Sequence, residues 1–482
     1  MPIRNTIIAF VALLVVGGVI YFTHSRTTVA PTHYLFNVKP DALTRLTLKY
    51  PNAEIDLVRE AGKWQLVKPV SAPADNDAVQ TLAQEIAQCQ IERTVDEHPA
   101  SLAPFGLAQP QATIIAATKA GALPAIEVGK TTPVGYNVYI KTSARPAVMI
   151  TAAAFGPGTK RTANDLRDHT LLSFSSDDVK RFVIQRPNSP AIEVDKQAGQ
   201  WAIVKPARFS ADQRAVRDFL NSLSNSRINE FVNDHPTDLA KYGLVQPKIT
   251  VTIYRDSGKP LVLDVGGQIM SVGKEGFYVQ RDGAPAVYSI NSWMFADLDK
   301  DLNDLRDKTV LAFEPSDVER IQVTQNGNTF NVVRKPAGKW YVESNGGSIK
   351  ALADPVKVEQ FMDHLRTIKG DQIAQDSPTD LSKFGLAAPG QQITLYGQGN
   401  KSLGWVKFAK LERHEDNKVI NPTQRIDYYA MSSQEPTVYG LYEASYRDLD
   451  NGISGLQAIS ALPAPVPAKP AKQAASGAPK HS

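Results

Sequence analysis

The stretch Leu239-Ala240-Lys241-Tyr242-Gly243-Leu244 decides the fold, because the chain carries it in three versions. It reads Leu102-Ala103-Pro104-Phe105-Gly106-Leu107 nearer the start and Leu381-Ser382-Lys383-Phe384-Gly385-Leu386 nearer the end. A proline follows each version within a few residues (Pro110, Pro247, Pro389). Successive versions lie roughly 140 residues apart, which is the size of a domain and far above the roughly 20–50 residues of a solenoid repeat.

Three further markers repeat in the same order around this stretch. A Gly-x-Trp motif precedes it, an aspartate lies between the two, and an Asn-Asp-Leu-Arg-Asp motif follows the first two versions. The tryptophans are Trp64, Trp201 and Trp340, the aspartates are Asp75, Asp212 and Asp354, and the last motif spans 164–168 and 303–307, with a weaker Tyr446-Arg447-Asp448. We therefore predict three tandem copies of one domain, at 34–172, 173–311 and 312–456, the third divergent.

Each copy is predicted to be a mostly antiparallel α+β domain. In the first, residues 44–48 and 55–58 alternate or nearly alternate as strands do, and the Gly-x-Trp motif fits a hairpin turn before a third strand. The helix that follows has apolar residues at the spacing i, i+3, i+4 and i+7, and the repeated aspartate is placed to cap its first turn. Runs of strands with segregated helices indicate the α+β class.

The N-terminal region, 1–33, predicts a transmembrane anchor and a linker. Residues 5–25 contain no charged side chain other than a protonatable His24, and as a helix they reach about 31 Å, enough to cross a bilayer. A cleaved signal peptide is the alternative, but its apolar region is usually about 7–15 residues long. With Arg4 in the cytoplasm, we expect a single-pass protein of the inner membrane whose C-terminal bulk lies in the periplasm.

Composition narrows the class of protein. A net charge of +4, from 53 basic and 49 acidic residues among 482, gives no field that favours nucleic acid as a partner. The one cysteine, Cys89, excludes an intramolecular disulfide and a zinc site built on cysteines. Residues 457–482 are rich in Pro, Ala and Lys, which predicts a disordered basic tail that is a candidate for contact with anionic polymer or lipid.

The repeated motifs resemble a bacterial family, the domain of unknown function with number 4340, over nearly the whole chain outside the anchor and the tail. The resemblance implies an N-terminal anchor and repeated α+β units. Some members are encoded beside gliding-motility-type ABC transporter components, which implies such a transporter as a partner. No activity is established for the family, so none is implied. The third copy departs from the pattern, since Ala409 stands near the position held by Gly129 and Gly266.

Arg167, Arg306 and Arg447 are the candidate ligand-binding residues, because they are the charged candidates that recur in all three copies. A guanidinium fork can clamp a phosphate or a carboxylate. The alternative is that each arginine ties the closing helix to its own domain, and we favour this structural role.

Other repeated residues fit structural roles better than chemical ones. His98 and His235 precede prolines, but the third copy has Ser377 there, so we predict a helix start rather than a general base. The tryptophans and Cys89 are predicted to lie in cores. The charged run at 412–416 is predicted to be a solvated loop rather than a metal site, and the sequence holds no phosphate-binding loop.

The sequence therefore favours a membrane-anchored envelope protein that binds or scaffolds without catalysis. The family resemblance alone implies that it is an accessory to an ABC transporter, and other envelope proteins are the alternative partners. The alternative is an envelope hydrolase that acts on glycan or peptide, with its site in a cleft between domains lined by polar residues of one copy. We assign no catalytic residue, cofactor or metal ligand, and the oligomeric state stays open.

Overall fold

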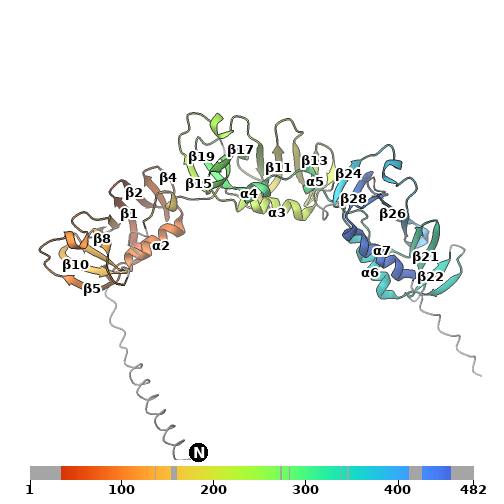
Figure 1. Ribbon diagram of the computed structural model, residues 1–482, viewed down its shortest axis with the longest axis horizontal. Helices are drawn as coiled ribbons and strands as arrows, with labels where there is room; N and C mark the ends of the chain where they lie inside the picture. Colours follow the sequence, from red (N-terminus) through yellow and green to blue (C-terminus); the bar gives the residue numbers. More distant parts are fainter. Residues whose placement is uncertain are drawn as a thin grey trace, which may run out of the picture. The chain divides into compact units, whose positions relative to one another are not determined.

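The strands form three antiparallel sheets that follow one another along the chain (Figure 1). The computed structural model describes residues 34–135, 137–152, 160–271, 274–281, 283–336, 338–344, 347–411 and 426–457. The predictions for the anchor at 1–33, for the charged run at 412–416 and for nearly all of the tail fall outside these residues and stay predictions. Among the described helices, none has the length and apolar character needed to cross a membrane.

All three sheets have the same strand order, which confirms the prediction of a mostly antiparallel α+β unit in tandem copies. In each, the first four strands run in reverse order to one edge, and the strand after the first long helix lies at the opposite edge. We call the stretches that carry these sheets the first, second and third copies.

The strand bounds are as follows. The first sheet has the order β4-β3-β2-β1-β6-β8-β9-β10-β5, with β7 beside β6, and contains β1 (Leu43–Tyr50), β2 (Ala53–Glu60), β3 (Lys63–Lys68), β4 (Ala72–Pro73), β5 (Ile91–Asp96), β6 (Ala112–Thr118), β7 (Gly121–Ala122), β8 (Ile126–Thr131), β9 (Val138–Thr142) and β10 (Arg145–Thr151). The second has the order β14-β13-β12-β11-β16-β17-β18-β19-β15 and contains β11 (Val179–Gln185), β12 (Ile192–Gln197), β13 (Gln200–Lys205), β14 (Phe209–Ser210), β15 (Glu230–Asn233), β16 (Ile249–Arg255), β17 (Leu261–Ser271), β18 (Lys274–Arg281) and β19 (Val287–Asn291). The third has the order β23-β22-β21-β20-β25-β26-β27-β28-β24 and contains β20 (Arg320–Gln325), β21 (Asn328–Arg334), β22 (Trp340–Ser344), β23 (Ile349–Leu352), β24 (Gln372–Asp376), β25 (Gln391–Tyr396), β26 (Ser402–Lys410), β27 (Tyr428–Ser432) and β28 (Thr437–Leu441).

The chain divides into two compact units. Unit 1 contains the chain up to Ser173, Ser224–Val245 and Val265–Ser292. Unit 2 contains Phe174–Leu223, Gln246–Asp264 and the chain from Trp293 onward. The division passes through the second sheet, and the predicted domain boundaries near residues 172 and 311 stay predictions.

One long helix follows the fourth strand of each sheet, as the apolar spacing predicts. These helices are α2 (Asn76–Ala87), α3 (Gln213–Ser224) and α6 (Pro355–Thr367). The repeated aspartate caps each of them: Asp75 accepts hydrogen bonds from two backbone N–H groups of the first turn, Asp212 likewise accepts two, and Asp354 accepts one. Each cap satisfies N–H groups that have no partner within the helix.

The copies close differently at their C-terminal ends. In the first, the Asn-Asp-Leu-Arg-Asp motif forms a single 3-10 turn at Asn164–Leu166. In the second, α4 (Ser292–Leu298) precedes a short helix at the motif, α5 (Leu302–Leu305). The third copy ends instead in a longer helix, α7 (Glu443–Gln457), which packs against α6.

The Gly-x-Trp motif forms the predicted hairpin turn. In the first copy, Ala61 and Gly62 join β2 to β3 with φ values of 48° and 85°. Positive φ at both central residues is the geometry of a type I′ turn, which matches the twist of the strands it joins and favours glycine. Trp64 therefore points into the core from the start of β3, where it is 1% exposed. Trp201 and Trp340 are also buried, as predicted.

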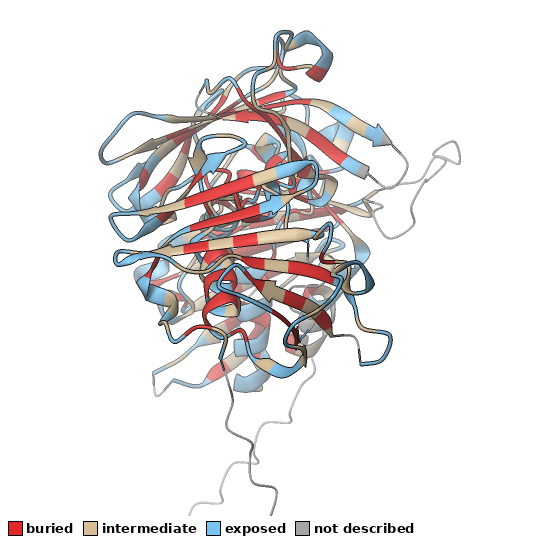
Figure 2. Ribbon diagram, turned by 90° about the vertical axis from the view of Figure 1, so that its left-hand side faces the viewer, coloured by how far each residue is buried: buried red, intermediate tan, exposed pale blue. Residues whose placement is uncertain are grey.

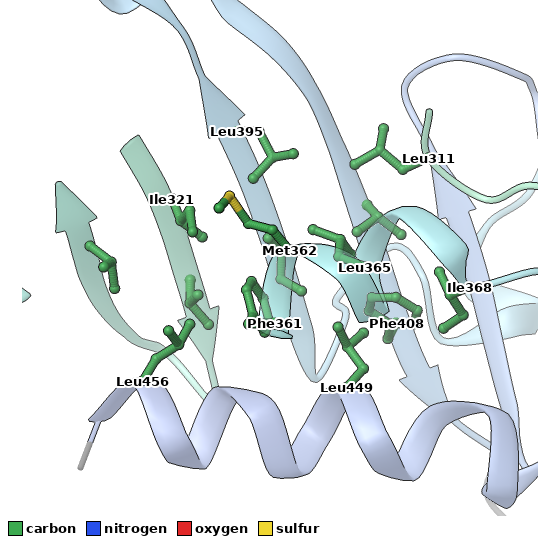
Figure 3. Close-up of a cluster of buried hydrophobic side chains, with 14 of the residues drawn as sticks. Leu311, Ile321, Phe361, Met362, Leu365, Ile368, Leu395, Phe408, Leu449 and Leu456 are labelled. Atoms are coloured by element: carbon green, nitrogen blue, oxygen red, sulfur yellow. The ribbon is translucent and has the colours of Figure 1, made fainter. Parts of the chain in front are cut away.

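Apolar side chains between the sheet and its helix form the core of each described copy, and Figure 2 shows buried residues along the strands and exposed ones at many turns. In the third copy, Leu449 and Leu456 of α7 join Phe361 of α6 and Phe408 of β26 in one cluster (Figure 3). The longer closing helix thus covers core surface, at the end of the copy where the first has a single 3-10 turn and the second has the shorter helices α4 and α5.

Candidate functional site

Arg167, the first predicted candidate, is buried and bound to an aspartate that follows the edge strand β15. Its side chain forms two hydrogen bonds to Asp234, Nη1 to Oδ2 at 3.1 Å and Nη2 to Oδ1 at 2.7 Å. The guanidinium carbon lies 3.7 Å from the centre of the Phe231 ring. All three residues belong to unit 1. The fork geometry expected for a ligand is therefore used by the protein itself.

Arg306, the second candidate, forms an equivalent ion pair in unit 2, although the aromatic ring beside it comes from its own copy. It is 1% exposed and donates two hydrogen bonds to Asp376, at 2.9 and 3.1 Å, while its guanidinium carbon lies 3.7 Å from the centre of the Phe209 ring. Thr437 donates a further hydrogen bond to Asp376 at 2.9 Å. Burial alone would raise the pKa of Asp376, but the bonds from Arg306 and Thr437 outweigh it and hold the pKa below its usual range.

The backbone around each arginine holds it in place. Arg167 forms an isolated antiparallel bridge with Ala74, and Asp168 N donates to Pro73 O at 2.9 Å. Arg306 bridges to Ala211 in the same way, and Asp307 N donates to Ser210 O at 2.8 Å. The motif thus adds a short bridge at the edge of its own sheet, while its arginine side chain reaches the neighbouring copy.

A second ion pair accompanies each arginine. The N-cap Asp75 accepts from Arg227 at 3.3 Å, and the N-cap Asp212 accepts from Lys369 at 2.8 Å. Each basic partner lies in the following copy. Burial would raise the pKa of Asp212, but the hydrogen bond from Lys369 and the N–H groups of α3 lower it below its usual range. Two ion pairs thus link the first copy to the second, and two link the second to the third.

Arg447 does not share the position of the other two arginines. It lies on α7, is exposed, and makes no recorded ion pair within the described residues. Tyr446 and Leu449 are buried on the inner face of this helix. The segment Tyr446-Arg447-Asp448 is therefore part of a helix that packs on the core, and it only resembles the closing motif by residue type. The structure therefore brings Arg167 and Arg306 into equivalent places and leaves Arg447 apart, while ligand binding by any of them stays a prediction.

The aspartates that bind these arginines were missed by the sequence reasoning, although a signal was present. An acidic residue precedes the His-Pro or Ser-Pro pair in every copy: Glu97, Asp234 and Asp376. The prediction for the histidines did not consider the acidic residues directly before them. Glu97 in the first copy is exposed, and the described residues contain no arginine placed against it.

The predicted helix start at His98, His235 and Ser377 is wrong. These residues lie in bends, and the 3-10 turns begin later, at Ala103, Ala240 and Ser382. The residue before each N-cap leucine is polar (Ser101, Asp238 and Asp380), and its side chain accepts from the backbone N–H two residues on. A polar residue before Pro favoured a cap, but Ser377 has φ 45°, outside the conformation of an N-cap.

A cavity of about 780 Å³ lies beside the second pair of ion pairs, entirely within unit 2. The side chains that give it its character are Trp201, Arg208, Arg214, Arg217, Lys369 and Glu435. They come from β13, the segment before α3, the first turns of α3 and two loops of the third copy. Its size falls within the range of about 300–1,000 Å³ that is typical of small-molecule sites.

Some of the basic side chains around this cavity form ion pairs, and others do not. Lys369 is bound to Asp212 at 2.8 Å and lies 4.0 Å from Asp307. Arg214 lies 3.6 Å from Asp218 across an exposed surface, where such a pair contributes little. Arg208 and Arg217 are exposed and have no acidic partner among the residues that the structure describes. The rim of the cavity therefore presents guanidinium groups with spare hydrogen-bond donors.

Cys89, a core residue by prediction, is buried beneath the end of α2. Its thiol lies 3.4 Å from the Thr151 hydroxyl, and burial raises its pKa although this hydrogen bond acts in the opposite direction. A thiol in this setting is a poor nucleophile.

Comparison with known proteins gives one family. The family model for a domain of unknown function, DUF4340, matches three segments, at residues 64–232, 201–351 and 347–462. The first two matches begin at the tryptophan of the Gly-x-Trp motif and continue through the closing motif into the next sheet. The model thus treats the junction between copies as part of the repeated unit.

The other comparisons carry no argument about fold or function. No curated protein matches the chain. Among solved structures, the DNA polymerase III subunit beta from Pseudomonas aeruginosa is 8% identical, with 85% of this chain and 95% of that chain covered and a TM-score of 0.12. The corresponding subunit from Thermotoga maritima is 10% identical, with 84% and 92% covered and a TM-score of 0.11.

Proposed function

We propose, from the premise that the chain belongs to the DUF4340 family, that it is a membrane-anchored binding or scaffolding protein of the bacterial envelope that works without catalysis. In this proposal residues 5–25 cross the inner membrane once and the three copies lie in the periplasm. An ABC transporter, or another envelope protein, is the proposed partner, on the strength of the family resemblance alone.

The observation that carries the proposal is the use of the repeated arginines. Arg167 and Arg306 are both buried and both hold an aspartate of the following copy through two hydrogen bonds. In both places the repeated arginine connects two successive copies. A series of coupled domains suits a protein that presents a surface to partners.

Membrane fractionation tests the anchor. The full chain should remain with membranes after alkaline extraction, and protease added to spheroplasts should digest the three copies. A Val15→Arg, Val16→Arg double variant should be released, because each arginine in the middle of a span costs about 2.5–3.5 kcal/mol. The matched control, Lys469→Glu with Lys472→Glu in the tail, should stay bound. Release of the unaltered chain, or digestion only after the inner membrane is broken, would reject the anchor or its orientation.

Crosslinking in intact cells tests the partner. A photoreactive residue at Met270, whose side chain is 82% exposed, should capture transporter components or other envelope proteins. The same residue at Met149, which is buried, serves as the control and should capture nothing. Recovery of no envelope protein from exposed positions in all three copies would count against a scaffolding role.

The envelope hydrolase is the second candidate, and the cavity in unit 2 is the observation that favours it. The cavity has polar lining residues that occur in the second copy alone, as an interdomain site would require. Two of its carboxylates, Asp212 and Asp307, face Lys369. Among the residues that the structure describes, Glu435 forms no ion pair, and it accepts a hydrogen bond from the Tyr439 hydroxyl at 3.3 Å. The full chain should turn over glycan or peptide polymers if it is a hydrolase, and Glu435→Gln should then abolish that turnover. Absence of turnover by the full chain would reject the hydrolase.

A further inference from the structure

The cavity in unit 2 differs from the equivalent places in the other copies by three arginines. Aligning the N-cap aspartates Asp75, Asp212 and Asp354 places the copies in register. In this register the second copy has Arg208, Arg214 and Arg217, the first has Ser71, Asp77 and Gln80, and the third has Lys350, Val356 and Glu359. The trio is therefore not required by the fold that the copies share.

Packing does not account for the trio either. Arg208 and Arg217 are exposed, and the side chain of Arg214 is 84% exposed. By contrast, the structural arginine of this junction, Arg306, is buried and contacts both Asp376 and Phe209. Three like charges beside one cavity repel one another, and an anion placed between them would relieve that repulsion.

The helix end contributes little of its own to the site. Two N–H groups in the first turn of α3, those of Arg214 and Ala215, donate to Asp212 at 3.0 and 3.1 Å. An anion in the cavity would therefore be held by guanidinium side chains, which match the oxygen geometry of both carboxylates and phosphates.

The carboxylates of the cavity add a second requirement. Glu435, on a loop of the third copy, and Asp307, at the end of the second copy's closing motif, also line the cavity, and ionised carboxylates only accept hydrogen bonds. A ligand that is anionic throughout would be repelled there. A ligand that carries both acidic groups and hydroxyl donors satisfies the guanidinium groups and the carboxylates, and this combination is characteristic of acidic sugars.

We propose that this cavity binds an acidic carbohydrate, with its carboxylate or phosphate groups on Arg208, Arg214 and Arg217 and its hydroxyl groups toward Glu435. The inference rests on the proposed function only in treating the chain as a binding protein. It needs neither the anchor nor the transporter, so fractionation and crosslinking can fail while it stands.

Calorimetric titration of the full chain in detergent tests the site with three probes. Trigalacturonate carries carboxylates, glucose 1,6-bisphosphate carries phosphates, and maltotriose is neutral. One or both acidic probes should bind at a single site per chain, and their difference identifies the acidic group. Maltotriose should bind at least about tenfold more weakly, because it lacks the charge-assisted bonds. Absence of binding by both acidic probes at millimolar concentration, or equal binding of maltotriose, overturns the proposal.

Two variants of equal net charge separate a site from general attraction. The site variant carries Arg208→Ala, Arg214→Ala and Arg217→Ala, and the control carries Arg93→Ala, Lys119→Ala and Lys180→Ala, which are exposed positions elsewhere. The site variant should lose affinity by about tenfold or more, since each removed guanidinium forfeits charged hydrogen bonds. The control should bind as the parent does. Equal weakening in both, at unchanged melting temperatures, would show non-specific attraction and reject the site.

Discussion

Arg306 and Asp376 form a bidentate ion pair in which the two partners are very unequally buried. The side chain of Arg306 is 1% exposed, whereas that of Asp376 is 42% exposed. Removing the aspartate leaves a buried charge without its acceptor, while removing the arginine leaves a carboxylate that water can reach. The cost of breaking the pair should therefore depend on which partner is removed.

We expect Asp376→Asn to lower the free energy of unfolding by about 3–5 kcal/mol and Arg306→Ala by about 2 kcal/mol. Urea denaturation of each variant measures both values. The double variant should cost less than the sum of the two, because the pair is already broken in either single variant. Equal losses in the two single variants would contradict the burial argument.

Arg447→Ala provides a matched comparison within the same motif. Because Arg447 is exposed on α7 and has no recorded ion pair in the described residues, its removal should change the free energy of unfolding by less than about 0.5 kcal/mol. Arg167→Ala, by contrast, should resemble Arg306→Ala, since it breaks an equivalent pair with Asp234. A large loss for Arg447→Ala would show that the third copy closes on a partner group that the structure does not show.

The ion pair also predicts a dependence on pH. The pKa of Asp376 is lower in the folded protein than in the unfolded chain, where it is about 3.9. Its contribution is therefore fully present above that value and is lost as the pH falls through the lower, folded pKa. The stability difference between the parent and Asp376→Asn should be constant from pH 7 to about pH 5 and shrink below about pH 4. A difference that grows on acidification would refute the assigned pKa direction.

Much of the fold could be predicted from repetition and periodicity. The Gly-x-Trp turn, the aspartate that caps the helix and the apolar face of the helix are local features. The residues that determine each of them are close together in the sequence. The structure confirms them because local propensity and core packing favour the same result. The same holds for Trp64 and Cys89, whose burial follows from their places on a strand and a helix.

The junctions could not be predicted in the same way. The partner of Arg167 is 67 residues away at Asp234, and that of Arg306 is 70 residues away at Asp376. Nothing in a local pattern states which carboxylate will meet a distant arginine, so a ligand and a link within one copy were the alternatives considered. The arginines instead link successive copies, an arrangement that appears only when the strand order is known.

The third copy shows where repetition misled the prediction. Arg447 matches the closing motif by residue type, yet the segment forms the helix α7 because Tyr446, Leu449 and Leu456 place apolar groups on one face. Helical periodicity outweighed the weak motif. The spacing of buried residues would have been the better guide at this position.

The glycine that the third copy lacks yields a further prediction. A Cβ on Gly266 in β17 would overlap the carbonyl oxygen of Tyr242, and Gly129 has the same relation to Phe105. In the third copy Ala409 occupies this place, and its Cβ lies beside Gly385. Gly266→Ala should therefore lower the free energy of unfolding by about 2–3 kcal/mol.

The reverse change, Ala409→Gly, is the control for that substitution. It introduces no overlap and should cost about 0.5–1 kcal/mol through added backbone freedom in a strand. Thermal and urea denaturation of the two variants measure the difference. If Gly266→Ala were the milder change, the loop at Tyr242 would have room that its packing against β17 does not show.

Cys89 offers a native probe of the first copy. Its thiol is 3% exposed, lies 3.4 Å from the Thr151 hydroxyl, and has a pKa raised by burial, so the reactive thiolate is scarce and sheltered. Iodoacetamide should therefore modify the native protein only through opening of α2 from its sheet, at a rate that rises with urea. The unfolded chain, assayed at the same pH, should react at the rate of a free thiol. Rapid modification of the native protein would mean that the end of α2 is not packed as the structure has it.

The Thr151→Ala variant distinguishes the two sources of protection, because it removes the hydrogen bond while leaving the helix in place. A small change in rate would assign the protection to burial, as the dominant effect on the pKa predicts.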